Sequence, residues 1–207
     1  MIRLALPRGR NLAPSLAAFR AAGLGLGGFE GEGRRPWAAS PEDGLEVLLL
    51  EDRDLPLYVE DGVADLGVIG SEVIEEVGAD LLVPLAFTNG GCRLSLLGRP
   101  GALPGPGGRV RLATKYPRTA RRLLAERPWS AEVVELSGSI ELAVLLELAQ
   151  VALGLVQPGR TLRDELVELE PLAEVGPRLV VNRAAFQQHR QQVNGLVSRL
   201  EAAGVAR

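Results

Sequence analysis

Short apolar runs alternate with amphipathic stretches along most of the chain, and glycine, proline or polar turns separate them. Apolar runs bounded by such turns predict buried strands, whereas apolar residues three or four positions apart predict helices that cover a sheet. The predicted strands are residues 2–6, 45–50, 65–69, 81–86, 92–97, 110–116, 131–136 and 151–156, with a strand pair around 167–174 and 178–181. The predicted helices are residues 12–22, 55–62, 72–77, 117–127, 140–148, 161–166 and 183–203. The glycine-rich residues 23–33 and the polar stretch that follows them to residue 43 are expected to be irregular.

The alternation of strand and helix stops at residues 99–108, which are rich in proline and glycine, and then restarts. This pattern predicts an α/β fold of two lobes, with hinges near residues 97–101 and 174–178. Lobe I would comprise residues 1–97, completed by 178–207, and lobe II residues 98–177. Because ligands of α/β folds bind at the carboxyl ends of strands, we expect a ligand cleft between the lobes.

The amino-acid composition indicates what kind of core the protein has and which cellular locations fit it. The chain has 207 residues, of which 46% are hydrophobic and only 4% aromatic, so the core must be built mainly from leucine, valine and alanine. No apolar run is long enough to span a membrane, and the first residues enter a predicted strand directly, so neither a membrane association nor a signal peptide is expected. Cys92 is the single cysteine, which excludes an internal disulfide and favours the cytoplasm.

The charged and metal-binding residue types argue against nucleic acid and metal ions as direct partners and draw attention to Lys115. A net charge of −3 does not favour nucleic-acid binding, and one histidine (His189) with one cysteine predicts no metal site in this chain. Any metal would be a hard cation carried by substrate phosphates. Lys115 is the only lysine among 23 basic residues, so either an ammonium group is needed there or a surface lysine has survived by chance.

The stretch "GLVQPGRTLRDEL" (residues 154–166) passes from a predicted strand through a glycine turn into a predicted helix. Gly159 permits close approach of a ligand to the backbone, and Thr161 with Asp164 fits a capping box. The free N–H groups of such a helix start suit a phosphate. The alternative is an ordinary turn that holds no ligand.

Four further polar turns follow or precede predicted strands, and three of them carry cations. The side chains of interest are Arg8, Arg10, Arg93, Lys115 and Glu141, and with Arg160 the cations could converge on a highly anionic substrate. Each turn can also be read as a solvated loop, and the Glu141 carboxylate as a partner of the helix dipole. Cys92 fits a small core residue better than a nucleophile, because no histidine lies near it in the sequence.

Seven segments together resemble the short form of ATP phosphoribosyltransferase. They are "LALPRGR", "DLPLYVEDGVADLGVIG", "GCRLSLL", "RLATKYPRTARRLL", "VVELSGSIELA", "GRTL" and "RLVVNRAA", in the family's order and over nearly the whole chain. The resemblance implies a two-lobed fold like that of periplasmic binding proteins, with the ligand cleft between lobes. It also implies a glycosyltransferase that moves ribose 5-phosphate from phosphoribosyl pyrophosphate to N1 of ATP, releases pyrophosphate with Mg²⁺, and begins histidine biosynthesis.

The resemblance also assigns roles to the candidate residues. Arg8, Arg10 and Arg93 would be the catalytic cations beside the phosphates, and Lys115 and Glu141 would lie near the nucleotide or ribose. The turn Gly159, Arg160, Thr161 and Leu162 would hold the 5-phosphate. The family's short form lacks a regulatory domain, so we expect a homodimer that assembles with a regulatory subunit similar to histidyl-tRNA synthetase.

Five positions depart from the family's usual pattern. Gln150 and Gly154 stand where the family carries aspartates, Gln157 and Pro158 replace acidic or hydroxyl residues, and Glu51 replaces a basic residue. Lost acceptors for ribose hydroxyls and a reversed charge near pyrophosphate predict reduced activity. Three hypotheses therefore stay open: an active enzyme with a changed ribose site, a weakly active or non-catalytic paralogue that binds nucleotide or acts as a partner subunit, and a binding module for another small anion.

Overall fold

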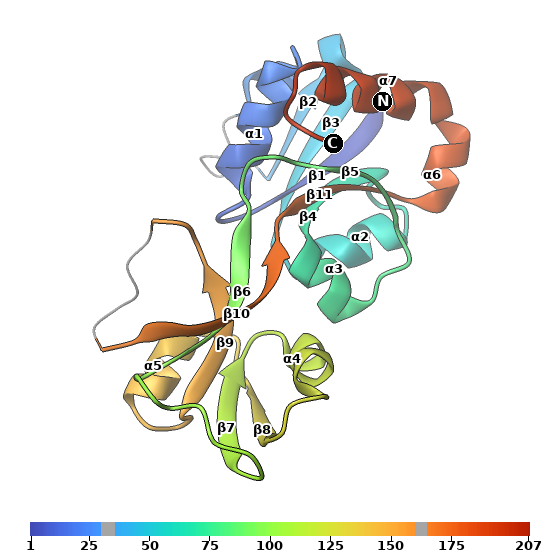
Figure 1. Ribbon diagram of the computed structural model, residues 1–207. Coiled ribbons are helices and arrows are strands. Elements are labelled where there is room, and N and C mark those ends of the chain that lie inside the picture. The colour runs from blue at the N-terminus through green and yellow to red at the C-terminus, as the bar shows by residue number, and fades with distance from the viewer. Residues whose placement is uncertain (30–35, 160–164) are drawn as a thin grey trace. The chain divides into compact units, whose positions relative to one another are not determined.

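The computed structural model describes residues 1–29, 36–159 and 165–207, and these form two compact units (Figure 1). Unit 1 comprises Met1–Gly90 and Gly176–Arg207, and unit 2 comprises Gly91–Val175. Each unit has its own mixed sheet with helices packed on it. The predicted fold class, α/β with two lobes, is confirmed.

Unit 1 is built on a six-stranded sheet of order β2-β3-β1-β4-β11-β5. Its strands are β1 (Ile2–Pro7), β2 (Trp37–Ser40), β3 (Leu45–Leu50), β4 (Leu66–Gly70), β5 (Leu82–Ala86) and β11 (Pro177–Val181). Its helices are α1 (Leu12–Ala21), α2 (Leu55–Glu60), α3 (Ser71–Val77), α6 (Arg183–Gln188) and α7 (Arg190–Ala202), with short 3-10 turns η1 (Leu26–Gly28) and η2 (Pro41–Asp43).

Strand β1 runs parallel to both of its neighbours, β3 and β4. The carboxyl ends of these three strands, at Pro7, Leu50 and Gly70, therefore lie at one edge of the sheet. The polar turns that follow them are brought together there, although they are far apart in the sequence. Strands β2, β11 and β5 extend this parallel centre by antiparallel pairing.

The alternation of side chains along each strand explains how helices cover both faces of this sheet. Phe19 of α1 and Leu200 of α7 belong to the buried cluster that includes Val68 of β4. The neighbouring residue Gly67 points the other way, where a Cβ atom would lie only 2.6 Å from Leu55 Cδ2 of α2. The missing side chain lets α2 lie directly on β4.

Unit 2 is built on a five-stranded sheet of order β10-β6-β9-β7-β8. Its strands are β6 (Cys92–Gly98), β7 (Arg109–Thr114), β8 (Ser130–Glu135), β9 (Val151–Val156) and β10 (Val167–Val175), and its helices are α4 (Pro117–Leu124) and α5 (Ile140–Leu145). Strand β7 is parallel to β8 and β9, whereas β6 and β10 are antiparallel. The carboxyl ends of β7, β8 and β9 thus share one edge of this sheet.

The two faces of the unit 2 sheet carry separate apolar clusters. Leu112 and Leu153 pack in one cluster with Leu124 of α4, and the alternate residues Ala113 and Ala152 pack in the other with α5. This is the period-two pattern of a sheet covered on both faces. Helices α4 and α5 therefore cover opposite faces of this sheet.

Three details of the sequence prediction were wrong. Residues 37–40 form the edge strand β2 rather than an irregular segment, because they pair with β3. The strands near 167–174 and 178–181 do not pair with each other: β10 pairs with β6 in unit 2, and β11 with β4 and β5 in unit 1. The C-terminal helix is divided at His189 into α6 and α7.

The unit boundaries also differ from the predicted lobe boundaries. The chain crosses between units after Gly90 and after Val175, rather than after residues 97 and 177. The difference is strand β6, which lies in unit 2 because its backbone pairs with β9 and β10. For the predicted helix 161–166, residues 161–164 lie outside the described part of the chain.

Candidate functional site

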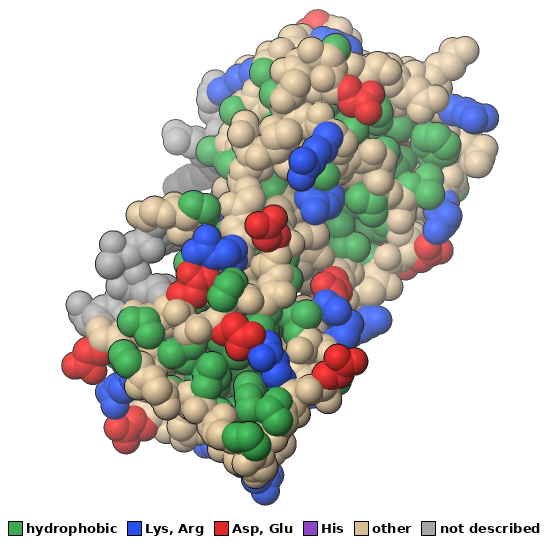
Figure 2. All heavy atoms as spheres, viewed as in Figure 1, with side chains coloured by type: hydrophobic (Ala, Val, Ile, Leu, Met, Phe, Trp, Pro, Cys, Tyr) green, Lys and Arg blue, Asp and Glu red, His purple; other side chains and the backbone are tan. Residues whose placement is uncertain are grey.

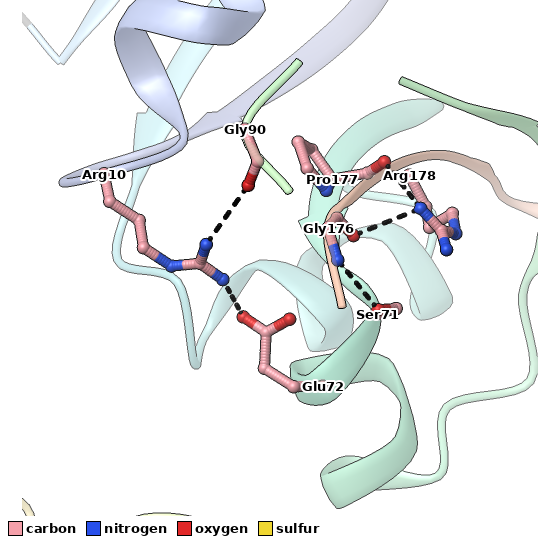
Figure 3. Close-up of polar contacts among 7 residues, drawn as sticks. All are labelled: Arg10, Ser71, Glu72, Gly90, Gly176, Pro177 and Arg178. Atoms are coloured by element: carbon pink, nitrogen blue, oxygen red, sulfur yellow. Dashed lines mark hydrogen bonds and ion pairs between the residues drawn. The ribbon is translucent and has the colours of Figure 1, made fainter. Parts of the chain in front are cut away.

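A polar cluster lies at the carboxyl edge of the unit 1 sheet, and we call Arg10, Asp52 and Glu72 the Arg10 cluster. Arg10 follows β1, Asp52 follows β3, and Glu72 lies in the first turn of α3 after β4. Figure 3 shows the Arg10 side chain reaching the Glu72 carboxylate and the Gly90 carbonyl oxygen. Nη2 donates a hydrogen bond to Glu72 Oε1, and Nη1 donates to Gly90 O at 3.4 Å.

The Arg10 cluster holds two carboxylates in a partly buried place. Burial raises the pKa of Asp52 to about 6; the Arg10 guanidinium opposes this shift, and the carboxylates of Glu72 and Glu51 add to it. Glu72 is only 1% exposed. Its Oε2 atom has no hydrogen-bond partner among the described residues. Arg10 is therefore the described cation that compensates a buried negative charge.

Arg8 lies beside the Arg10 cluster in sequence but is far more exposed. Its Nε atom is 3.3 Å from Glu51 Oε1, and both side chains are largely in solvent. Glu51, one of the departures from the family pattern, therefore partly neutralises Arg8. An exposed pair of this kind is weak and can exchange for a phosphate at small cost.

In unit 2 the turn that carries Lys115 is fixed by a buried threonine. The Thr114 hydroxyl donates to the Leu153 carbonyl oxygen at 2.9 Å and accepts from the Tyr116 N–H at 2.9 Å. Thr114 is completely buried, and Lys115 is half-buried at the end of β7. The polar turn was visible in the sequence, but the anchoring role of Thr114 was not, because its partner comes from the neighbouring strand.

Glu141 lies in the first turn of α5 and is half-buried. The Ser139 hydroxyl accepts a hydrogen bond from Leu142 N at 3.4 Å and donates to Glu141 Oε2 at 3.0 Å. Glu141 is thus held by the cap of its own helix, as the dipole interpretation predicts. Only one of its carboxylate oxygens takes part in this contact.

Arg93 makes an ion pair within the unit 2 sheet. Its Nε and Nη2 atoms donate to the two carboxylate oxygens of Glu168 at 2.8 and 2.7 Å, and the Ser95 hydroxyl donates to Glu168 at 2.7 Å. The hydrogen bond from Arg93, followed by that from Ser95, lowers the pKa of Glu168 to about 2. Glu168 and Ser95 were not singled out from the sequence, because strand register brings them to Arg93.

The predicted phosphate turn is described only in part. Gly159 is exposed with φ +77°, a left-handed conformation that favours glycine. Arg160, Thr161 and Leu162 lie outside the described residues. Upstream, Gln150 precedes β9 at the opposite edge of the sheet, where its Oε1 accepts a hydrogen bond from Arg111 N at 2.8 Å. Gln150 has a structural partner at this edge.

The candidates therefore form two sets. Arg8 and Arg10 lie at the carboxyl edge of the unit 1 sheet, with Asp52 and Glu72. Lys115, Glu141 and Gly159 follow the parallel strands of unit 2, and Arg93 joins them because it pairs with Val156 at the end of β9. Sequence reasoning found these turns but missed Asp52 and Glu72 as partners of Arg10.

The surface and the helices of the described residues add three observations. On the face that Figure 2 shows, Lys and Arg side chains are interspersed with Asp and Glu and form no continuous basic area. No group of three His, Cys, Asp or Glu among the described residues could hold a metal ion. Within the same residues, no helix combines the length and the apolar character that crossing a membrane requires.

Comparison with known proteins gives one consistent family. The family model HisG, ATP phosphoribosyltransferase, matches residues 51–202. An ATP phosphoribosyltransferase of Thermus thermophilus is 46% identical over 200 residues, which cover 96% of this chain and 95% of the relative. One from Deinococcus radiodurans is 43% identical over 204 residues, covering 96% and 89%.

A solved structure is also similar over nearly the whole chain. It is the ATP phosphoribosyl transferase (HisG:HisZ) complex from Thermotoga maritima, with a TM-score of 0.80, 25% identity and 98% coverage of each chain. The similarity extends through both sheets and therefore includes both sets of candidate residues.

Proposed function

The chain belongs to the ATP phosphoribosyltransferase family, and we propose that the polar sets at the carboxyl edges of its two sheets bind the substrates. It condenses ATP with phosphoribosyl pyrophosphate to give phosphoribosyl-ATP and pyrophosphate, the first step of histidine biosynthesis. No observation favours the non-catalytic alternative or a binding module for another anion.

The observation that carries the site proposal is the position of the cations at the carboxyl ends of parallel strands: Arg8 and Arg10 follow β1, and Arg93 pairs with Val156 at the end of β9. Ligands of α/β folds bind at this edge. Pyrophosphate leaves C1 of the ribose as a good leaving group, so the enzyme needs to orient N1 of ATP and to neutralise the departing phosphates. Arg8, Arg10 and Arg93 supply that positive charge. Arg8 and Arg93 exchange their present carboxylate partners, Glu51 and Glu168, for phosphate oxygens.

In unit 2 we assign the ribose 5-phosphate to the turn that begins at Gly159. The left-handed conformation of Gly159 suits a phosphate-binding turn, and the sequence pattern adds Arg160, Thr161 and Leu162 to the proposed phosphate-binding residues. Lys115 and Glu141, which follow the other two parallel strands of the same sheet, contact the nucleotide or the ribose. An ammonium donates to phosphate or hydroxyl oxygens, and a carboxylate accepts from hydroxyl groups.

Mg²⁺ enters this site as part of the substrate. The enzyme acts on phosphorylated substrates, and Mg²⁺ prefers phosphate oxygens while it keeps several waters. The ion supplies charge neutralisation to the pyrophosphate, and the arginines add to it. We also propose that the protein works in the cytoplasm, in line with the biosynthetic role of its relatives.

We further propose a homodimer that assembles with a regulatory subunit similar to histidyl-tRNA synthetase. The support for the regulatory subunit is the similar structure from Thermotoga maritima, which is a HisG:HisZ complex, at 98% coverage of both chains. Sedimentation that shows only monomer at micromolar concentration would contradict the dimer.

Turnover of ATP with phosphoribosyl pyrophosphate tests the function directly. The purified chain is assayed for phosphoribosyl-ATP with Mg²⁺, alone and with the regulatory subunit from the same organism. We expect product in at least the combined assay. Nucleotide binding without product in both assays would instead support the non-catalytic paralogue.

A further inference from the structure

We propose that Glu72 is a positioning residue for the transferase reaction: its buried carboxylate holds the Arg10 guanidinium in place, and Gly70 provides the room that this carboxylate needs. The inference rests on the proposed role of Arg10 at the substrate phosphates. Glu72 is assigned no contact with substrate.

The first support is the burial and bonding of Glu72. The residue is 1% exposed, and the donor to its Oε1 is Nη2 of Arg10, which comes from a loop 62 residues earlier. A buried carboxylate is costly unless it is paired, so an ionised Glu72 needs a cation at this position. Arg10 in turn is held at two points, by Glu72 and by the Gly90 carbonyl oxygen (Figure 3). A guanidinium fixed in this way loses less side-chain entropy when it meets a phosphate.

The second support is Gly70, the last residue of β4. A Cβ atom at this position would lie 2.7 Å from both Cδ and Oε2 of Glu72. The Glu72 side chain therefore folds back over the Gly70 Cα atom, so a Cβ atom at position 70 would have to displace the carboxylate. The backbone of Gly70, with φ −64° and ψ 136°, is one that any residue adopts, so the need for glycine comes from the carboxylate and not from the turn.

The third support is the geometry of the sheet. Arg10 and Glu72 follow β1 and β4, which are adjacent and parallel, so two strand ends present the pair to the same edge. The second carboxylate of the cluster, Asp52, follows β3 on the opposite side of β1. The Arg10 guanidinium is thus set between carboxylates at the edge where we place the substrate phosphates.

Two single variants separate the charge of Glu72 from its position. Glu72→Gln keeps the shape and removes the charge, and Gly70→Ala keeps the charge and displaces the carboxylate. We expect each to lower kcat/KM for phosphoribosyl pyrophosphate at least about tenfold, or 1.4 kcal/mol. Glu170→Gln in unit 2, which breaks the ion pair with Arg127, is the matched control and should stay within about twofold.

A double-variant cycle distinguishes positioning from a general structural role. Arg10→Met should lower kcat/KM at least as much as Glu72→Gln, and the Arg10→Met/Glu72→Gln double variant should be no slower than Arg10→Met alone. Multiplicative losses in the double variant would overturn the inference. All rates are measured at a temperature below the thermal unfolding midpoint of each variant. If Glu72→Gln does not fold, the kcat/KM of Gly70→Ala tests the positioning role instead.

The remaining outcomes separate this inference from the proposed function. If Arg10→Met turns over like the parent enzyme, the proposed role of Arg10 is wrong, and Glu72 has nothing to position. If Arg10→Met is impaired while Glu72→Gln and Gly70→Ala are not, the substrate role stands and the positioning role is wrong. Titration of the parent enzyme and of each variant with inorganic pyrophosphate should rank their affinities in the same order as their kcat/KM values.

Discussion

Ser71 and Gly176 exchange two hydrogen bonds at the point where the chain returns to unit 1. The Ser71 N–H donates to Gly176 O at 2.9 Å, and the Gly176 N–H donates to Ser71 Oγ at 3.1 Å. Figure 3 shows this pair at the start of α3, next to Glu72. Because Ser71 and Glu72 are consecutive, the contact that anchors the returning strand also fixes the helix turn that bears Glu72.

Ser71→Ala should destabilise the protein by about 1 kcal/mol, because Gly176 N–H loses its acceptor in a partly buried place. The free energy of unfolding is measured in urea. Ser198→Ala, at an exposed position of α7, is the control and should change stability by less than about 0.5 kcal/mol. Equal effects of the two substitutions would show that the Ser71 hydroxyl contributes nothing particular.

The ion pair of Arg93 with Glu168 should make the free energy of unfolding depend on pH in the acid range. The pKa of Glu168 is lowered from 4.5 to about 2 in the folded protein, so its contribution is present above pH 4.5 and is lost as the pH falls toward 2. Glu168→Gln should cost about 1 kcal/mol at pH 7, after discounting for solvent screening, and close to nothing near pH 2. Urea unfolding at pH 7, 5 and 3 checks this, and a difference that is constant with pH would contradict it.

The raised pKa of Asp52 predicts the opposite dependence of stability on pH. Its pKa is raised from 3.8 to about 6, so the folded state favours the protonated form, and stability is lost as the pH rises from 3.8 through 6. Asp52→Asn should therefore stabilise the protein by roughly 1–2 kcal/mol at pH 7 and have little effect below pH 4. Thermal unfolding at both pH values measures it. A variant that is less stable than the parent at pH 7 would show that the ionised carboxylate is needed for the fold.

Gly154 is a packing position as well as a departure from the family pattern. A Cβ atom there would overlap Cδ1 of Ile140 in α5, and its surroundings are an apolar cluster. Gly154→Asp should cost roughly 2–3 kcal/mol more than Gly154→Ala, because it also buries a carboxylate. Urea unfolding of both variants checks the stability. If Gly154→Asp is as stable as Gly154→Ala and is faster with phosphoribosyl pyrophosphate, position 154 faces the ribose instead.

The phosphate turn is tested by Thr161→Val, which keeps the shape of the side chain and removes its hydroxyl. We expect binding of phosphoribosyl pyrophosphate to weaken by roughly 1–2 kcal/mol, because the phosphate loses one hydrogen bond. Titration calorimetry with the Mg²⁺ complex measures it, with the exposed Ser130→Ala as the control. Unchanged affinity would remove Thr161 from the site.

The order of most strands and helices, and the places where polar turns follow strands, could be predicted from the amino-acid sequence. This was possible because hydrophobic periodicity is a local property: a run such as residues 66–70 is apolar because both faces of its sheet are covered. The glycine, arginine and lysine residues of the turns could also be identified from the sequence, because their positions after predicted strands are a local property too. The resemblance of seven segments to one family, which the comparisons support, also needed only the order of residues.

Which of those turns lie next to one another could not be predicted, because it depends on the pairing of strands that are distant in the sequence. Sheet order places β1 between β3 and β4, and this sets Arg10 between Asp52 and Glu72, which lie 42 and 62 residues later in the chain. Strand register gives Arg93 its partner Glu168, and separates β10 from β11 although they are neighbours in the chain. Pairing of distant strands depends on the packing of whole faces. The burial and the charges that set the pKa values of Asp52 and Glu168 arise only once those faces are closed.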